Sequence, residues 1–157
     1  MCSDLGACNG FRVLRYAWQS FFHSPRTMKT QSSLELSDIQ AIAAAAQAEA
    51  QNNNWAVSIA IVDAGGHLLH FQRLDGAAPV SSHIAPAKAK TAAMGQRETK
   101  IYEDVINGGR YSFLNATAVL QGTLEGGVNI VVDGQTIGAV GVSGVKSNED
   151  AEIAKAG

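Results

Sequence analysis

Among the four histidines of the chain, His83 occupies the position best suited to binding a ligand. It lies in residues 81–86, a Ser-Ser-His-Ile-Ala-Pro run that we interpret as the first turn of a helix after a loop. Helix N-termini attract anions because their first N–H groups lack partners within the helix. A neutral imidazole can also ligate haem iron. The alternative is that His83 is an ordinary exposed surface residue.

Lys88 follows on the same predicted helix, one turn after Ile84 and among small apolar residues. A lysine in such surroundings must reach a carboxylate, a carbonyl oxygen or a ligand. Lys88 is therefore the second candidate for the site, and a structural ion pair is the alternative role. Lys90 is expected to be solvated.

Two further candidates, Arg110 and Tyr111, follow the flexible glycine pair at 108–109. They could form walls of a pocket or cover the edge of a sheet. We therefore predict a small-molecule site at the start of the helix, around His83 and Lys88, with Arg110 and Tyr111 as candidate walls. No metal site is predicted, because His67 and His70 are three residues apart in an expected strand and point to opposite faces.

No catalytic motif is present in the sequence. It lacks a phosphate-binding loop, a Gly-x-Ser-x-Gly nucleophile turn, a zinc-protease motif and a dinucleotide-binding fingerprint after a strand. Glycines at 138, 141 and 144 lie in and after a predicted strand. We interpret them as allowing close approach of a helix or of another subunit, in preference to a phosphate cradle.

The elements that must position these residues are short. Two hairpins are expected, one pairing 57–63 with 67–73 around Ala-Gly-Gly and one pairing 128–132 with 136–143 around Asp-Gly. The remaining pattern predicts a helix over 36–51 that begins with a capping box formed by Ser37 and Gln40. Further helices are expected over 81–97 and 100–106, and a last helix begins at Ser147, capped by Ser147 and Asp150. Residues 110–117 are expected to be irregular, and residues 119–124 to form a strand.

Hairpins dominate this order and no βαβ repeat appears. The sequence thus predicts an α+β fold, an antiparallel sheet of about five strands with helices packed on it. The alanine-rich helix faces and the glycine-lined strand also predict close packing between subunits of a homo-oligomer.

Composition excludes several classes of protein. Hydrophobic residues make up 46% and charged residues 17%, as in globular domains. The net charge of −2 leaves no basic face for nucleic acid, and no apolar run approaches the roughly 20 residues that cross a membrane. No cysteine occurs after residue 28. This suits a cytoplasmic location, although it does not by itself argue against export.

The first 27 residues differ from the rest of the chain. They hold five of the ten aromatic residues, both cysteines and three basic residues against one acidic residue. A second methionine, Met28, stands at the boundary. We predict that residues 1–27 are a non-essential extension and that 28–157 form a single domain.

Several segments of this domain resemble one known family, the GlcG and HbpS group of haem-degrading-type proteins, which also supplies the C-terminal domain of PduO-type adenosyltransferases. The Asp-Ala-Gly-Gly-His-Leu string at 63–68 and the Gly-Val-Ser-Gly string at 141–144 are its most specific motifs. The similarity covers nearly all of 34–157 through 57–68, 73–77, 88–92, 126–128, 132–144 and 149–157. One departure is Asn129, which stands where the family usually has proline.

The resemblance implies a profilin-like fold and homo-oligomers, often octamers. It also implies one of several functions: binding of haem, corrinoid or another small molecule, an enzymatic activity on a small metabolite or on haem, or an accessory role in glycolate or diol catabolism without activity of its own. Haem is therefore the cofactor we expect first. The family does not use one common iron-binding residue, so no ligand is carried over to this chain.

Overall fold

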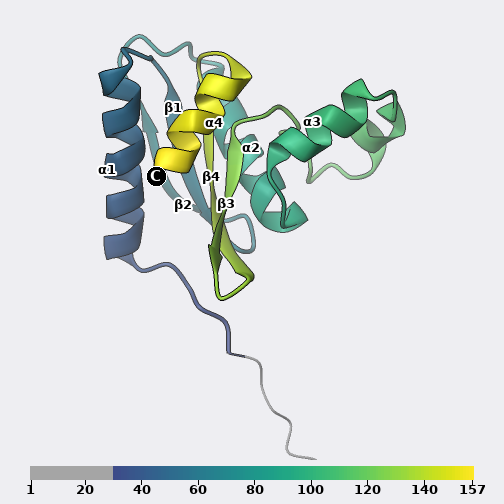
Figure 1. Ribbon diagram of the computed structural model, residues 1–157, viewed down its shortest axis with the longest axis horizontal. Coiled ribbons are helices and arrows are strands. Elements are labelled where there is room, and N and C mark those ends of the chain that lie inside the picture. The colour runs from purple at the N-terminus through teal and green to yellow at the C-terminus, as the bar shows by residue number, and fades with distance from the viewer. Residues whose placement is uncertain (1–29) are drawn as a thin grey trace, which may run out of the picture. The chain divides into compact units, whose positions relative to one another are not determined.

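The computed structural model describes residues 30–157, and the predicted extension 1–27 lies outside the described residues. Nine elements follow one another along this part of the chain (Figure 1). They are α1 (Leu36–Asn52), β1 (Ser58–Asp63), β2 (Leu68–Arg73), α2 (Ser81–Gly95), α3 (Thr99–Asn107), the 3₁₀ helix η1 (Tyr111–Asn115), β3 (Gly127–Val132), β4 (Gln135–Ser143) and α4 (Ser147–Ala156).

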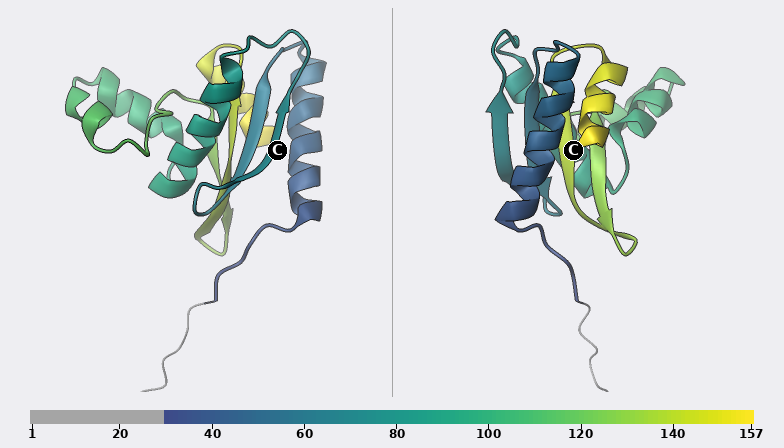
Figure 2. Two further views of the ribbon diagram at one scale, coloured as in Figure 1. Left: turned by 180° about the vertical axis from the view of Figure 1, so that it is seen from behind. Right: turned by 60° about the vertical axis from the view of Figure 1, so that its left-hand side comes forward.

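The strands form one antiparallel sheet in the order β2-β1-β4-β3, and both predicted hairpins are present. Helices α1 and α4 lie side by side on one face of this sheet, and α2 covers the other face (Figures 1 and 2). The domain is therefore a three-layer α+β arrangement with β1 and β4 at its centre.

Alternation along β1 supplies a separate core to each face of the sheet. Ile59 and Ile61 point toward α1 and α4, where branched side chains such as Ile153 fill the space. Ala60 and Val62 point the other way, against the alanines of α2. Because successive strand residues face opposite sides, one β-strand serves both cores.

The α2 side is packed unusually closely, and Gly141 of β4 shows why. A Cβ atom built on Gly141 would lie 2.2 Å from the carbonyl oxygen of Ala85 and 2.5 Å from the backbone nitrogen of Ala89. Only glycine lets the helix backbone approach the strand to this distance. The structural interpretation of this glycine, close approach of a helix, is therefore confirmed.

The prediction of a fifth strand over 119–124 is wrong, and the sheet has four strands. This segment runs along α2, where a Cβ atom on Gly122 would lie 2.2 Å from the carbonyl carbon of Ala87. The backbone N–H of Gly122 donates a hydrogen bond to Thr91 Oγ1 of this helix, at 3.0 Å. Residues 119–124 thus lie against a helix and belong to none of the strands of the sheet.

Helix α1 begins as expected but uses a different cap. The Ser37–Gln40 capping box is wrong, because Glu35 is the N-cap residue and its N–H donates to Asp38 Oδ2 at 2.9 Å. Likewise α4 has Lys146 at its N-cap, and Lys146 N donates to Glu149 Oε2 at 3.1 Å. Both corrections shift the cap by one or two residues, which is the usual uncertainty of a helix end.

Two other predicted boundaries also change. Residues 111–115 form the 3₁₀ helix η1 inside a segment that we expected to be irregular. Helix α2 ends at Gly95, before the predicted end at residue 97, because Gln96 adopts a left-handed conformation with φ of 52°. A left-handed residue directly after a helix is a common way to end it.

Replacing Gly141 by alanine is expected to destabilise the domain by about 1–3 kcal/mol, because the added methyl group must push α2 away from β4. Urea unfolding monitored by circular dichroism measures this difference. The control is Gln135→Ala at the half-buried start of the same strand, where little change is expected. Equal stability of Gly141→Ala and the parent protein would contradict the close-packing argument.

Candidate functional site

Lys88 does not face a ligand, because it lies in the interior with 1% of its surface exposed. Its ammonium donates to Asp150 Oδ2 of α4 at 2.8 Å and to the carbonyl oxygen of Val142 at 3.0 Å. The backbone at Gly126 leaves room for this group, since a Cβ atom there would lie 2.8 Å from Lys88 Nζ. Lys88 therefore has the alternative role, that of a structural ion pair.

The partner carboxylate, Asp150, is equally enclosed, with 2% of its surface exposed. Its second oxygen accepts a hydrogen bond from the backbone N–H of Val145 at 3.2 Å. Burial raises the pKa of Asp150 above its ordinary value, and the hydrogen bond and charge of Lys88 oppose this rise. Burial of both members leaves no open position for a ligand beside them.

His83 lies in the first turn of α2, as predicted, and its side chain is exposed. Within residues 30–157 its ring takes part in no recorded side-chain hydrogen bond or ion pair. The structure therefore neither assigns a partner to this imidazole nor blocks it. Its role as a ligand stays a prediction.

Arg110 and Tyr111 belong to a different part of the domain, the arm formed by α3 and η1. The ring of Phe113 in η1 lies 5.5 Å from that of Tyr102 in α3, and the Arg110 guanidinium lies 5.6 Å from the Phe113 ring. Tyr111 is 65% exposed. Among the described residues no recorded hydrogen bond or ion pair joins this arm to His83, so their shared site remains a prediction.

Two contacts place α2 along β1 and against the β1–β2 turn. At its start, Ser81 Oγ lies 2.8 Å from Ser58 Oγ at the start of β1. At its other end, a Cβ atom on Gly66 in the β1–β2 turn would lie 2.9 Å from Lys90 Cγ and 3.2 Å from Met94 Sδ. Helix α2 thus runs along β1, with Lys90 and Met94 toward the β1–β2 turn.

The neighbouring residues follow from helix and strand geometry. His83 precedes Lys90 by seven residues, which is two helical turns, so both lie on one side of α2. The sheet register pairs Ala60 with Phe71 and Val62 with Leu68, which places these side chains on the α2 face. We call the resulting surface the α2–β2 strip, and its members are Leu68, Phe71, Arg73, His83, Lys90 and Met94.

This strip is apolar and positively charged at the same time. Leu68 is 55% exposed, Met94 44% and Phe71 38%. Lys90 and Arg73 are also exposed, and within the described chain neither takes part in a recorded ion pair. Sequence reasoning missed the strip because it treated the hairpin and the helix separately. The seven-residue spacing of His83 and Lys90 is the feature of the sequence that indicates a shared helix face.

A second polar feature, the pair of Asp63 and His67, lies at the β1–β2 turn, where Asp63 lines a hollow together with Leu34 and Leu69. His67 Nδ1 lies 3.0 Å from Asp63 Oδ2, and Asp63 Oδ1 also accepts the backbone N–H groups of Gly65 and His67 at 2.8 and 2.9 Å. Partial burial acts to raise the pKa of Asp63, but the hydrogen bonds and charge of His67 and the hydrogen bond from Gly65 outweigh it and hold the pKa below its ordinary value.

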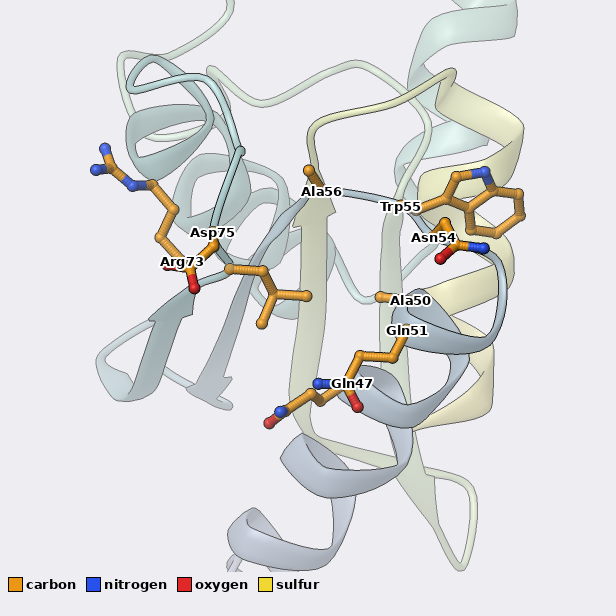
Figure 3. Close-up of a pocket in the computed structure, with 9 residues that line it drawn as sticks. Gln47, Ala50, Gln51, Asn54, Trp55, Ala56, Arg73 and Asp75 are labelled. Atoms are coloured by element: carbon orange, nitrogen blue, oxygen red, sulfur yellow. The ribbon is translucent and has the colours of Figure 1, made fainter.

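A hollow with a volume of about 500 Å³ lies elsewhere on the domain. It lies between the end of α1 and the segment after β2, and Figure 3 shows Gln47 and Gln51 extending along it from α1. The Arg73 side chain extends away from α1 in the same view (Figure 3). This direction agrees with the sheet register, which pairs Arg73 with Ser58 on the α2 face.

Two negative findings apply to residues 30–157. No three side chains of His, Cys, Asp or Glu gather there in a way that would hold a metal ion. None of the helices described there combines the length and the apolar character needed to cross a membrane.

A sequence model of HbpS-like haem-degrading proteins matches residues 34–157. The chain belongs to this HbpS-like family. Protein GlcG of Escherichia coli (strain K12) is 57% identical over 116 residues, which cover 74% of this chain and 85% of GlcG. The family assignment made from the motifs at 63–68 and 141–144 is therefore confirmed.

Solved structures show that the similarity to HbpS-like proteins holds for the fold as well as for the sequence. The crystal structure of Klebsiella pneumoniae protein ORFY superposes with a TM-score of 0.77 at 30% identity, covering 83% of this chain and 91% of that chain. A crystal structure of a PduOC:haem complex superposes with a TM-score of 0.73 at 34% identity, covering 80% of this chain and 92% of that chain.

The buried pair in this HbpS-like domain predicts a strong coupling between two substitutions. Asp150→Leu and Lys88→Met each leave the other charge buried without a countercharge, and we expect each to cost about 3–5 kcal/mol of unfolding free energy. The double variant Lys88→Met, Asp150→Leu removes both charges and should cost much less than the two single changes together. Chemical denaturation of all four proteins gives the coupling energy.

The matched control is Lys100→Met, which removes the exposed ion pair with Asp104 and should leave the free energy of unfolding nearly unchanged. Additive effects of the Lys88 and Asp150 substitutions would show that the two side chains do not act as a pair.

Proposed function

We propose that this protein binds haem, and that the α2–β2 strip is where it does so. The observation that carries the proposal is an exposed apolar surface, formed by Leu68, Phe71 and Met94, next to two cations that lack recorded anionic partners. Membership of the HbpS-like family and the similarity to a PduOC:haem complex support haem over other apolar anions.

The residues present suit the group in three respects. A porphyrin is a flat apolar ring that loses water when it lies on aliphatic and aromatic side chains. Its two propionates are anionic, and Lys90 and Arg73 can donate charge-assisted hydrogen bonds to carboxylates. The exposed imidazole of His83 would be the group of the strip that holds the iron. Bound haem would supply an iron centre that changes oxidation state.

Titration of the protein with hemin is expected to give a saturable change in the Soret absorption band. Charge reversal at the strip, Lys90→Glu or Arg73→Glu, should weaken hemin affinity about three- to tenfold, because each change replaces attraction of a propionate by repulsion. The control is Lys146→Glu, an exposed lysine at the start of α4 with an 80% exposed side chain. Absence of any saturable hemin binding by the parent protein would overturn the proposal.

We also propose that the protein forms a homo-oligomer through the arm of α3 and η1. The arm extends away from the sheet in all three views (Figures 1 and 2). It and the segment that follows expose Ile101, Tyr111, Leu114 and Leu124, each between 45% and 65%. Large apolar side chains gathered on one extension are typical of a protein–protein interface. A second copy of this chain is the partner we propose.

Light scattering at micromolar concentration should give a mass of more than one chain. Leu114→Glu is expected to lower this mass, because a charge buried in an apolar interface is costly. Leu36→Glu is the matched control, since Leu36 on α1 is also exposed, at 69%, but lies outside the arm. A parent protein with the mass of one chain would contradict the proposal.

A further inference from the structure

We propose that the free edge of β3 pairs with β3 of a second copy of this chain, in antiparallel register about a two-fold axis at Val131. The pairing joins the two four-stranded sheets into one continuous sheet. This surface is distinct from the arm of α3 and η1. The inference shares with the proposed homo-oligomer only the need for a second copy.

The two edges of the sheet differ in how well they are protected from pairing. Within the described residues, the strand order leaves β2 and β3 at the edges. The register of β2 with β1 skips Leu69, so the edge strand itself is bulged, and β2 ends on the exposed cation Arg73. The register of β3 with β4 is also irregular, but there the skipped residue is Ile137 of β4.

Bulges, charges and prolines on an edge strand are the usual protection against pairing with another strand. Strand β3, Gly127–Val132, has none of them, since its sequence is Gly-Val-Asn-Ile-Val-Val. Its three valine and isoleucine types also favour extended backbone. Of the two edges, β3 is therefore the one that is open to a further strand.

Hydrogen bonds establish which backbone groups of β3 face away from β4. Val142 N donates to the carbonyl oxygen of Gly126 at 2.9 Å. Because hydrogen-bonded pairs alternate along an antiparallel ladder, the N–H and C=O groups of Gly127 and Asn129 point away from β4. Gly127 agrees with this alternation, since its N–H donates to Thr99 Oγ1 of α3 at 2.8 Å.

Val131 also points away from β4. After the irregularity, Val132 pairs with Gln135. The two turn residues between them, Asp133 and Gly134, have φ of 50° and 73°, which is typical of a two-residue hairpin turn closed by a hydrogen-bonded pair. The N–H and C=O groups of the preceding residue, Val131, are therefore on the open side.

Asn129 and Val131 thus form an unpaired stretch of the edge. Outside the β3–β4 ladder, no hydrogen bond within residues 30–157 is recorded for the backbone of either residue. Val131 is 55% exposed and Val132 40%. The β3–β4 hairpin extends past the ends of α1 and α2 in all three views (Figures 1 and 2), so this part of the edge lies beyond the helices that cover the sheet.

Two registers would set outward-facing groups of β3 opposite the same groups of a second copy. A register centred on Asn129 uses the edge at Gly127, which is already bonded to α3. It also sets Asp133 of one copy opposite Glu125 of the other, and like charges directly opposite each other are destabilising. A register centred on Val131 avoids both conflicts.

The register centred on Val131 is self-complementary. Val131 of each copy donates its N–H to the carbonyl oxygen of Val131 in the other copy. Ile130 of each copy lies opposite Val132 of the other, on the face that carries α1 and α4, and such cross-strand pairs of β-branched residues are stabilising. Asp133 is set opposite Asn129, which is neutral. A second copy is therefore the partner that matches this edge in hydrogen bonding, shape and charge.

The first test is cross-linking of the full chain at the axis. Val131→Cys, with Cys2 and Cys8 changed to serine, places two thiols on paired residues whose Cα atoms are about 5.5 Å apart, a separation that a disulfide spans. We expect oxidation to join the chains in pairs and mass spectrometry to locate the bond between the two copies of residue 131. The control is Val80→Cys, at a valine of similar exposure (58%), which should not cross-link.

The second test removes one N–H group. Val131→Pro deletes an N–H that points away from β4, so the β3–β4 ladder keeps its bonds. Light scattering over a dilution series should show association weakened about tenfold or more, because each pair of chains loses two backbone hydrogen bonds. Val131→Thr keeps both the N–H and the β-branched shape and should associate like the parent. Circular dichroism of each variant checks that the fold is retained.

The outcomes separate this contact from the arm. A parent protein with the mass of one chain would overturn both. If the parent associates but Val131→Cys does not cross-link, or Val131→Pro associates like the parent, the β3 contact is overturned and the arm stands. If Leu114→Glu leaves the mass unchanged while Val131→Pro lowers it, the arm is overturned and the β3 contact stands. If Val131→Pro does not fold, the cross-linking result decides.

Discussion

The buried ion pair between Lys88 and Asp150 is the interaction on which the arrangement of the layers depends. The two residues come from α2 and α4, helices that pack on opposite faces of the sheet. Lys88 also donates to the carbonyl oxygen of Val142 in β4. Three layers therefore meet at one ammonium group. Moving any one of them would leave a charge buried without a partner, which costs several kcal/mol.

Close packing of α2 follows from the same constraint. For Lys88 to reach Val142 and Asp150, the helix must lie almost on the backbone of β4, and the contact residues are accordingly alanines on α2 and Gly141 on β4. A short separation between helix and sheet also brings the outward side of α2 down to the level of β2. The α2–β2 strip is thus a consequence of the way in which the inner side of the helix is fixed.

The two edges of the sheet differ in what they expose. Strand β2 presents Leu68 and Phe71 on the α2 face, where α2 lies over β1 and β4 and leaves the edge open. Strand β3 exposes Val131 and Val132 near its end, and the arm of α3 and η1 carries further exposed apolar residues. A domain whose interior is filled mainly by alanine and branched aliphatic residues places its larger apolar side chains outside, where ligands and other subunits can cover them.

The sequence by itself determined the local elements, since hairpins, helices and their turns depend on neighbouring residues. It also determined the family, because the strings at 63–68 and 141–144 are specific. It did not determine the count of strands, because 119–124 has strand-like residues but lies against α2, where Gly122 bonds to Thr91. Nor did it decide between the two roles of Lys88, because its partner Asp150 is 62 residues away along the chain. Gly66 and Lys90 come together in the same way: their proximity arises from the packing of α2 along β1, which no local pattern contains.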